Sequence, residues 1–224
     1  MCATTAHAAA GDNPNHKEQV RAALKAAARV NTVRVFEDGP FVFAHSEYEA
    51  GAPKIGIDVF RFEGGKIVEH WENVQAKPAH PNPSGRDMIG GPATPRDLAK
   101  SAANKELVRA FVTDILMGAH RERLGSYFAG DHYIQHNPNI GDGVASMAAA
   151  FKAMAAKGLA TKHDRIRQIL GEGDFVLSVS EGTRGGVPTS FYNLFRIEDG
   201  KIAEHWDTIE SIPRGEWKND NGKF

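Results

Sequence analysis

The sequence predicts an α+β fold made of two related halves, and two observations lead to this prediction. A stretch of twelve residues occurs twice: Phe60–Trp71 reads FRFEGGKIVEHW and Phe195–Trp206 reads FRIEDGKIAEHW, with nine positions identical. The copies lie much farther apart than the roughly 20–50 residues of a solenoid or propeller repeat. In each half, helical periodicity comes first and a run of alternating segments follows, which is the order of an α+β domain.

The first half is expected to begin with one helix and to continue as a four-strand meander. Residues 16–30 place Val20 and Leu24 on one helical stripe, and Asn15 with Glu18 forms a capping-box pattern. Turn signals rich in glycine and proline separate the expected strands. These strands are 32–37, 41–49, 54–62 and 66–75.

The second half is longer at its front. After a proline-rich linker at 77–95, Lys105–Met117 is an amphipathic helix that stops at Gly118, and 121–128 is a shorter helical piece. Val144–Ala156 is a third helix. The expected strands are 164–170, 174–182, 187–197 and 201–210. The first half has no counterpart of the two helices at 105–128, so it is an abridged version of the second.

Composition excludes several classes of protein. The net charge is −1 and the pI is about 6.8, so no basic excess favours nucleic acid or anionic lipid. The single cysteine, Cys2, allows no internal disulfide, and no apolar run reaches the roughly 20 residues of a membrane span. The N-terminus is a poor signal peptide. We therefore expect a soluble, cytoplasmic protein.

Two further motifs connect the second half with a known family. Residues 133–138 read YIQHNP and are followed by Asp142-Gly143, and the closing hairpin reads DGKIAEHWD at 199–207. This pattern resembles the SnoaL-like branch of the nuclear-transport-factor-2-like superfamily, which includes polyketide cyclases and ketosteroid isomerase. The resemblance implies a cone in which a strongly curved antiparallel sheet wraps on helices around a pocket. The expected division is an abridged module at 1–76, a linker at 77–101, a complete module at 102–212 and a polar tail at 213–224.

The closing motif EHWD supplies the main catalytic candidates. On a strand, His205 and Asp207 point to one face, whereas Glu204 and Trp206 point to the other. If the first face lines a partly dry pocket, burial raises the pKa of Asp207 toward the range useful for proton transfer at neutral pH. The resemblance implies the same role, because SnoaL-type cyclases use a strand aspartate as general acid/base without metal or cofactor. The alternative is that EHW is only a packing and hairpin signature.

Further side chains are expected to bind the substrate or stabilise a developing oxyanion. In the second half these are Tyr133, Gln135, His136, Asn137, Phe191 and Asn193. In the first half, Asp58 and His45 are candidates for a second set of pocket residues. A zinc site at Asp131, His132 and His136 is disfavoured, because Asn-Pro directly after His136 argues against the helix that the spacing requires. We expect no metal and no cofactor.

The functional prediction is a small-molecule enzyme of aldol cyclase, isomerase or lyase type, acting on an apolar carbonyl-containing substrate. A hydrolase or dehydratase using the same pocket is a further possibility. The competing prediction is a non-catalytic ligand-binding or dimerisation module of the same fold. The two modules are expected to pair through their sheets as an intramolecular pseudo-dimer, with homodimerisation left open.

Overall fold

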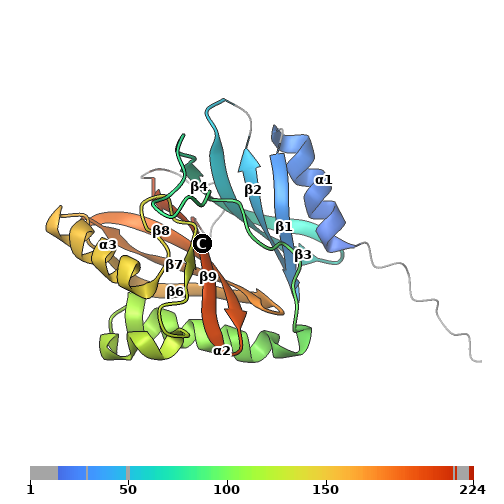
Figure 1. Ribbon diagram of the computed structural model, residues 1–224. Coiled ribbons are helices and arrows are strands. Elements are labelled where there is room, and N and C mark those ends of the chain that lie inside the picture. Colours follow the sequence, from blue (N-terminus) through green and yellow to red (C-terminus); the bar gives the residue numbers. More distant parts are fainter. Residues whose placement is uncertain (1–14, 29, 49–50, 214, 216–221) are drawn as a thin grey trace, which may run out of the picture.

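The structure, a computed structural model, describes residues 15–28, 30–48, 51–213, 215 and 222–224. It contains two mainly antiparallel sheets with few helices, which confirms the α+β class (Figure 1). The elements of the first half are α1 (His16–Ala28), β1 (Val30–Asp38), β2 (Phe41–Tyr48), β3 (Lys54–Glu63) and β4 (Lys66–Ala76). Those of the second half are η1 (Leu98–Lys100), α2 (Ser101–Phe111), η2 (Val112–Leu116), η3 (Arg121–Tyr127), β5 (Ile134–Gln135), α3 (Val144–Ala156), β6 (Thr161–Glu172), β7 (Phe175–Arg184), β8 (Val187–Glu198) and β9 (Lys201–Ser211).

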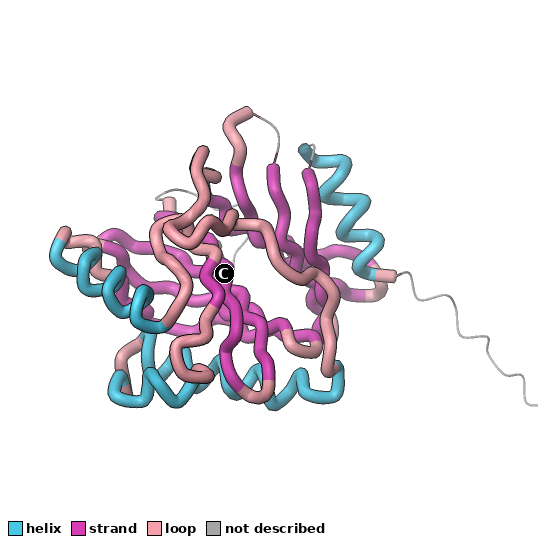
Figure 2. The backbone as a smooth tube through the Cα atoms, in the orientation of Figure 1, coloured by secondary structure: helices cyan, strands magenta, loops and turns pink. Residues whose placement is uncertain are grey.

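The molecule has four layers: helix α1, the first sheet, the second sheet, and the helices α2 and α3. Side chains alternate along each strand, so each sheet has one face toward each neighbouring layer. The first sheet has the order β1-β2-β3-β4 and the second has the order β5-β9-β8-β7-β6, with β5 parallel to β9. Helix α1 packs Val20 and Leu24 on the outer face of the first sheet. The inner faces of the two sheets pack against each other, and the helices α2 and α3 lie on the far face of the second sheet (Figures 1 and 2).

The core between the sheets joins residues from both halves of the chain. Phe36 of β1 stacks on Phe175 of β7 with ring centroids 4.5 Å apart, and Trp206 of β9 is fully buried in the same cluster. Polar contacts continue this interface along its edge, where Asn73 Nδ2 donates to the Thr208 carbonyl oxygen at 2.7 Å. The two halves therefore share one hydrophobic core.

The repeated hairpins have the same local geometry. Asp199 and Gly200 both have positive φ, 49° and 72°, and Gly64 and Gly65 of the first copy have 57° and 75°. Two consecutive left-handed residues form the tight hairpin turn that suits twisted strands. Each hairpin also carries a register shift at the same place, between Arg61 and Phe62 in one copy and between Arg196 and Ile197 in the other.

The structure differs from the sequence-based expectations mainly at element boundaries. The helix expected to continue to 117 changes at Val112 into a π-helical turn, and strand β6 begins at Thr161 rather than 164. The segment 77–97 contains no regular element, but it is not a free tether, because Met88 and Ile89 are buried. In addition, Asn82 Nδ2 donates to two carbonyl oxygens of the second half. No helix in the described part of the chain has the length and apolar character needed to cross a bilayer.

Candidate functional site

A pocket lies between the concave face of the second sheet and the helices that cover it. Its free volume is about 60 Å³, which is small beside the several hundred Å³ of typical small-molecule sites. Aromatic and aliphatic side chains from α2, η2, α3 and β8 form its apolar walls. They are Phe111, Leu116, Met147, Phe151, Met154, Phe191 and Phe195.

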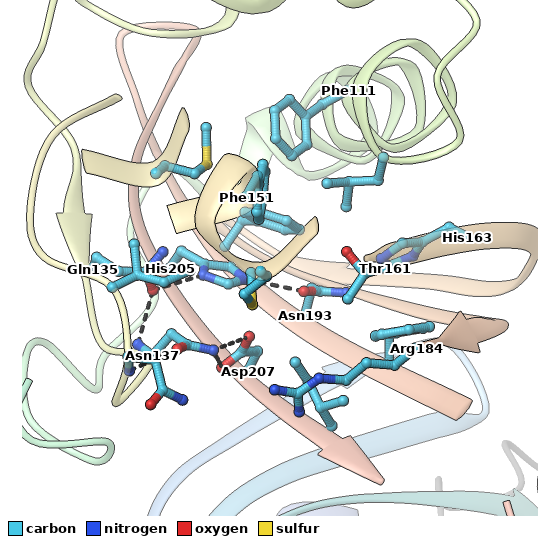
Figure 3. Close-up of a pocket in the computed structure, with 18 of the residues that line it drawn as sticks. Phe111, Gln135, Asn137, Phe151, Thr161, His163, Arg184, Asn193, His205 and Asp207 are labelled. Carbon is cyan, nitrogen blue, oxygen red and sulfur yellow. Dashed lines mark hydrogen bonds between the residues drawn. The ribbon is translucent and has the colours of Figure 1, made fainter. Parts of the chain in front are cut away.

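Asp207 is held inside this pocket by one amide. Its side chain points to the pocket from β9, and the residue is 6% exposed. Asn137 Nδ2 donates to both carboxylate oxygens, at 2.9 and 2.8 Å (Figure 3). Burial raises the pKa of Asp207 to about 6, whereas the Asn137 bond and the positive charge of Arg184 act in the opposite direction. The carboxyl group thus titrates close to neutral pH, as a general base requires.

His205 lies on the same face of β9 but organises neighbouring amides rather than contacting Asp207. Its Nδ1 lies 2.9 Å from Gln135 Oε1 and its Nε2 lies 3.1 Å from Asn193 Oδ1. Burial, followed by the charges of His136 and His163, lowers the pKa of His205 to about 3, so the ring is neutral at physiological pH. A neutral ring donates only one hydrogen, so it satisfies one of these two oxygens at a time.

Two polar groups in the pocket keep a hydrogen available for a ligand. Asn193 Nδ2 is buried and has no hydrogen-bond partner. The Tyr133 hydroxyl accepts from Gln135 Nε2 at 3.2 Å, which leaves its own hydrogen free to donate. Burial raises the pKa of Tyr133 well above its usual value, so the hydroxyl keeps that hydrogen. Both groups are donors of the kind that bind a carbonyl oxygen.

The opposite end of the pocket carries a cation. Figure 3 shows Gln135 and Asn137 on one side and Thr161, His163 and Arg184 on the other. Burial lowers the pKa of His163 to about 4, so this histidine is neutral and Arg184 supplies the charge. The first half of the chain also reaches the pocket.

Gln75 of β4 belongs to the first half and lines the pocket from the first sheet. Its Oε1 accepts the backbone N–H of Ile209 at 2.9 Å. The pocket is therefore formed mainly by the second half but closed in part by the first.

The expectation that His136 lines the pocket is wrong, and strand alternation explains why. Tyr133, Gln135 and Asn137 face the pocket, so His136 faces the reverse side. There its Nε2 lies 2.9 Å from Glu204 Oε1. Its ring also stacks on Trp206, with a centroid distance of 4.8 Å.

His45 also lies outside this pocket. It follows Phe43 on the inner face of β2, which packs against the second half. Its Nδ1 lies 3.1 Å from Arg34 Nη1, and the Arg34 guanidinium lies 4.3 Å from the centre of the Trp206 ring. Because it is fully buried next to a cation, His45 has its pKa lowered well below its usual value. It is a structural histidine of the interface.

Asp58 lies on the outer face of the first sheet, away from this pocket. Its carboxylate accepts the Tyr48 hydroxyl at 2.9 Å and lies 2.8 Å from His70 Nε2. Together with Glu72, these groups place ligand atoms within 4.8 Å of one another, so among the described residues Asp58, His70 and Glu72 form a set that could hold a metal ion. No comparable set involves Asp131 and His132 in the described chain.

The structure brings together Asp207, His205, Tyr133, Gln135, Asn137, Asn193 and Phe191 from the predicted site, and adds Arg184 and Gln75, which sequence reasoning missed. Asn137 continues the odd-numbered series of Tyr133 and Gln135, a signal that the sequence itself carries. Arg184 and Gln75 gave no such signal. Arg184 ends a strand beside a glycine turn, and Gln75 belongs to the other half.

Comparisons with solved structures give fold-level matches to half of the chain. A protein of unknown function with a cystatin-like fold from Xanthomonas campestris is 23% identical, with a TM-score of 0.41, covering 48% of this chain and 91% of that one. A proposed polyketide cyclase from Streptomyces antibioticus is 19% identical, with a TM-score of 0.38 and coverages of 48% and 91%. A proposed ketosteroid isomerase from Kribbella flavida is 15% identical, with a TM-score of 0.41 and coverages of 55% and 88%.

The sequence comparison is more specific about the family. No curated protein matches the chain. The family model of the SnoaL-like domain matches residues 108–205, which extend from α2 to His205 of β9 and include most of the pocket. Residues 108–205 of this protein therefore form a SnoaL-like domain.

Proposed function

We propose that the pocket catalyses cofactor-free proton transfer at a carbon atom next to a carbonyl group, as in aldol cyclisation, isomerisation or elimination. The observation that carries this proposal is Asp207, a buried carboxylate with a pKa of about 6 in an enclosed and mostly apolar pocket. A base of that pKa is ionised at neutral pH and is still basic enough to take a proton from an activated carbon.

The proposed step uses only side chains already described. The substrate carbonyl oxygen binds the free hydrogens of Asn193 Nδ2 and Tyr133, and Asp207 removes the neighbouring proton. The C–H bond breaks, its electron pair forms the enolate, and the proton resides on the carboxyl group until it returns to carbon or passes to water. Donors aimed at the enolate oxygen stabilise it most in a dry site. His205 and Asn137 act as positioning residues.

Hydrogen–deuterium exchange tests this step without knowledge of the natural substrate. Small enolisable ketones are incubated in D₂O with the protein, and the loss of the α-proton signal is followed by NMR. We expect the wild type to accelerate exchange of at least one ketone, and Asp207→Asn to reduce the acceleration by about 10²–10⁴-fold while the ketone still binds. Asp164→Asn, on an exposed part of β6, is the matched control and should exchange as fast as the wild type.

A ligand-binding module without catalysis is the second candidate, and it is favoured by the first copy, which keeps the hairpin but carries Glu72 at the position of Asp207. On that alternative, ketones bind but exchange at the rate measured in buffer, and Asp207→Asn changes nothing. Either result contradicts the catalytic proposal. Acceleration that survives in Asp207→Asn would assign the base to another residue.

We also propose that the first half takes the place of a partner subunit. The shared core at Phe36, Phe175 and Trp206 supports this, because such a sheet-to-sheet contact otherwise needs a second chain. A mass measurement in solution should find a monomer, or a small oligomer that forms without using the contact between the two sheets. A large stable oligomer in which the first sheet of one molecule packs on the second sheet of another would contradict the proposal.

A further inference from the structure

The side chain of Arg184, the cation of the pocket, forms no hydrogen bond or ion pair with the residues that the structure describes. Of the described residues that line the pocket, Arg184 alone is a lysine or arginine. Its Nε is buried and makes no hydrogen bond, and no ion pair among the described residues includes its guanidinium. By contrast, Arg167 on the neighbouring strand pairs with Glu181 at 2.7 Å and Arg196 pairs with Glu204 at 2.8 Å. A buried N–H without an acceptor is costly, so a ligand group at this position would be stabilising.

The nearby carboxylate does not satisfy Arg184. Asp207 is close enough for the charge of Arg184 to lower its pKa, but no hydrogen bond or ion pair joins the two side chains. The buried Nε–H of Arg184 is therefore left for an occupant of the pocket. A planar group with two oxygens matches the paired N–H donors of arginine best.

A second donor lies beside this cation. Thr161 is the direct cross-strand partner of Arg184, so the two side chains lie on the same face of the sheet, and both line the pocket. Asn193 lies between His205 and Thr161 (Figure 3), and its free Nδ2 suits a neutral carbonyl oxygen, as does the Tyr133 hydroxyl. The pocket thus offers donors for a carbonyl oxygen and, close to Asn193, a cation for an anion.

From this arrangement we infer that the substrate is an oxo acid: a compact molecule whose carboxylate pairs with Arg184 and Thr161 while its ketone lies between Asn193 and Asp207. This inference rests on the proposed function for the role of Asp207, but the carboxylate contact stands on Arg184 itself. Because the pocket walls are apolar, we expect the rest of the substrate, apart from its carboxylate and its ketone, to be a hydrocarbon. An ester or amide of the same acid would lose the contact with Arg184.

Binding of matched probes tests the inference. The probes are levulinate and 4-oxo-4-phenylbutanoate, each compared with its methyl ester by calorimetry or ligand-observed NMR. We expect at least one acid to bind tenfold or more tightly than its ester in the wild type. Arg184→Gln should remove this preference, and Arg165→Gln, an exposed arginine on β6 outside the pocket, should retain it.

A measurement on the wild type covers the case in which Arg184→Gln does not fold. Raising the salt concentration from 50 to 500 mM should weaken binding of the acid and leave binding of the ester unchanged, because only the acid forms an ion pair. Equal affinities of acid and ester in the wild type, or a preference that persists in Arg184→Gln, would overturn the inference.

The same probes separate this inference from the proposed function. If the acids bind through Arg184 but their α-protons exchange no faster than in buffer, the catalytic proposal fails and the oxo-acid site stands. If esters bind and exchange as well as the acids, the oxo-acid site fails and the catalytic proposal stands.

Discussion

The side-chain Nδ2 of Asn137 donates hydrogen bonds to both carboxylate oxygens of Asp207, at 2.9 and 2.8 Å. This amide stabilises the ionised form and so opposes the effect of burial on the pKa of Asp207. Asn137→Ala should therefore raise that pKa above its value of about 6. The pH dependence of the Asp207 carboxyl ¹³C shift measures it. Asn139→Ala, which removes a pocket amide with no bond to Asp207, is the control and should leave the pKa unchanged.

Stability should show what burial of Asp207 costs. The folded-state pKa of about 6 lies above the ordinary value of 3.8, so the folded chain holds this proton more tightly than the unfolded chain does. The resulting stabilisation is present at low pH and is lost as the pH rises through about 6. Asp207→Asn should thus be more stable than the wild type at pH 8, by about 3 kcal/mol in the free energy of unfolding. Urea titrations should find the difference much smaller at pH 4.5, and a difference independent of pH would contradict the assigned pKa.

The rate of α-proton exchange should depend on pH in a related way. Only the ionised carboxylate of Asp207 accepts a proton, so the catalysed rate should rise with pH through about 6 and then level off. His205 should add no second step near neutral pH, because burial lowers its pKa to about 3. A catalysed rate that falls between pH 5 and 7 would mean that the essential group is protonated.

The two repeated hairpins allow the free-energy cost of breaking a buried ion pair to be compared with the cost of breaking a more exposed one at the same position. Glu204 binds both His136 and Arg196, and its side chain is 3% exposed, whereas Glu69 at the same place in the other hairpin is 19% exposed and binds Arg61. Although burial acts to raise the pKa of Glu204, its two hydrogen-bonded partners lower it overall. Glu204→Gln should cost about 3–5 kcal/mol of unfolding free energy, and Glu69→Gln clearly less. Equal losses of unfolding free energy in chemical denaturation would show that burial does not set the cost of breaking the ion pair.

The shared core should make the two halves unfold together. Phe175→Ala removes a fully buried ring that stacks on Phe36 of the first half, and it should cost about 3–5 kcal/mol. The unfolding transition should remain single when followed by tryptophan fluorescence and by circular dichroism. Val68→Ala, at a half-exposed position, should change stability little. Two separated transitions in Phe175→Ala would mean that the halves are independent folding units.

Much of the fold was predictable because local patterns specify it. The periodicity around Val20 and Leu24, the turn at Asp199-Gly200 and the alternation through His205 and Asp207 are properties of neighbouring residues, and the structure contains each of them. The error at His136 had a local cause as well. Its neighbours Gln135 and Asn137 line the pocket, whereas His136, directly after β5, lies on the reverse side beside Glu204.

The sequence by itself determined the α+β class, the related hairpins and the face on which Asp207 lies, because these depend on patterns within a few residues. The tertiary structure decided that Asn137 binds Asp207, that the buried Nε of Arg184 has no hydrogen-bond partner among the described residues, and that Gln75 of the first half helps to close the pocket. These contacts join residues far apart in the chain, and no local pattern records which distant strands will meet. Packing between the sheets and under the helices fixes them, and with them the charge and the shape of the pocket.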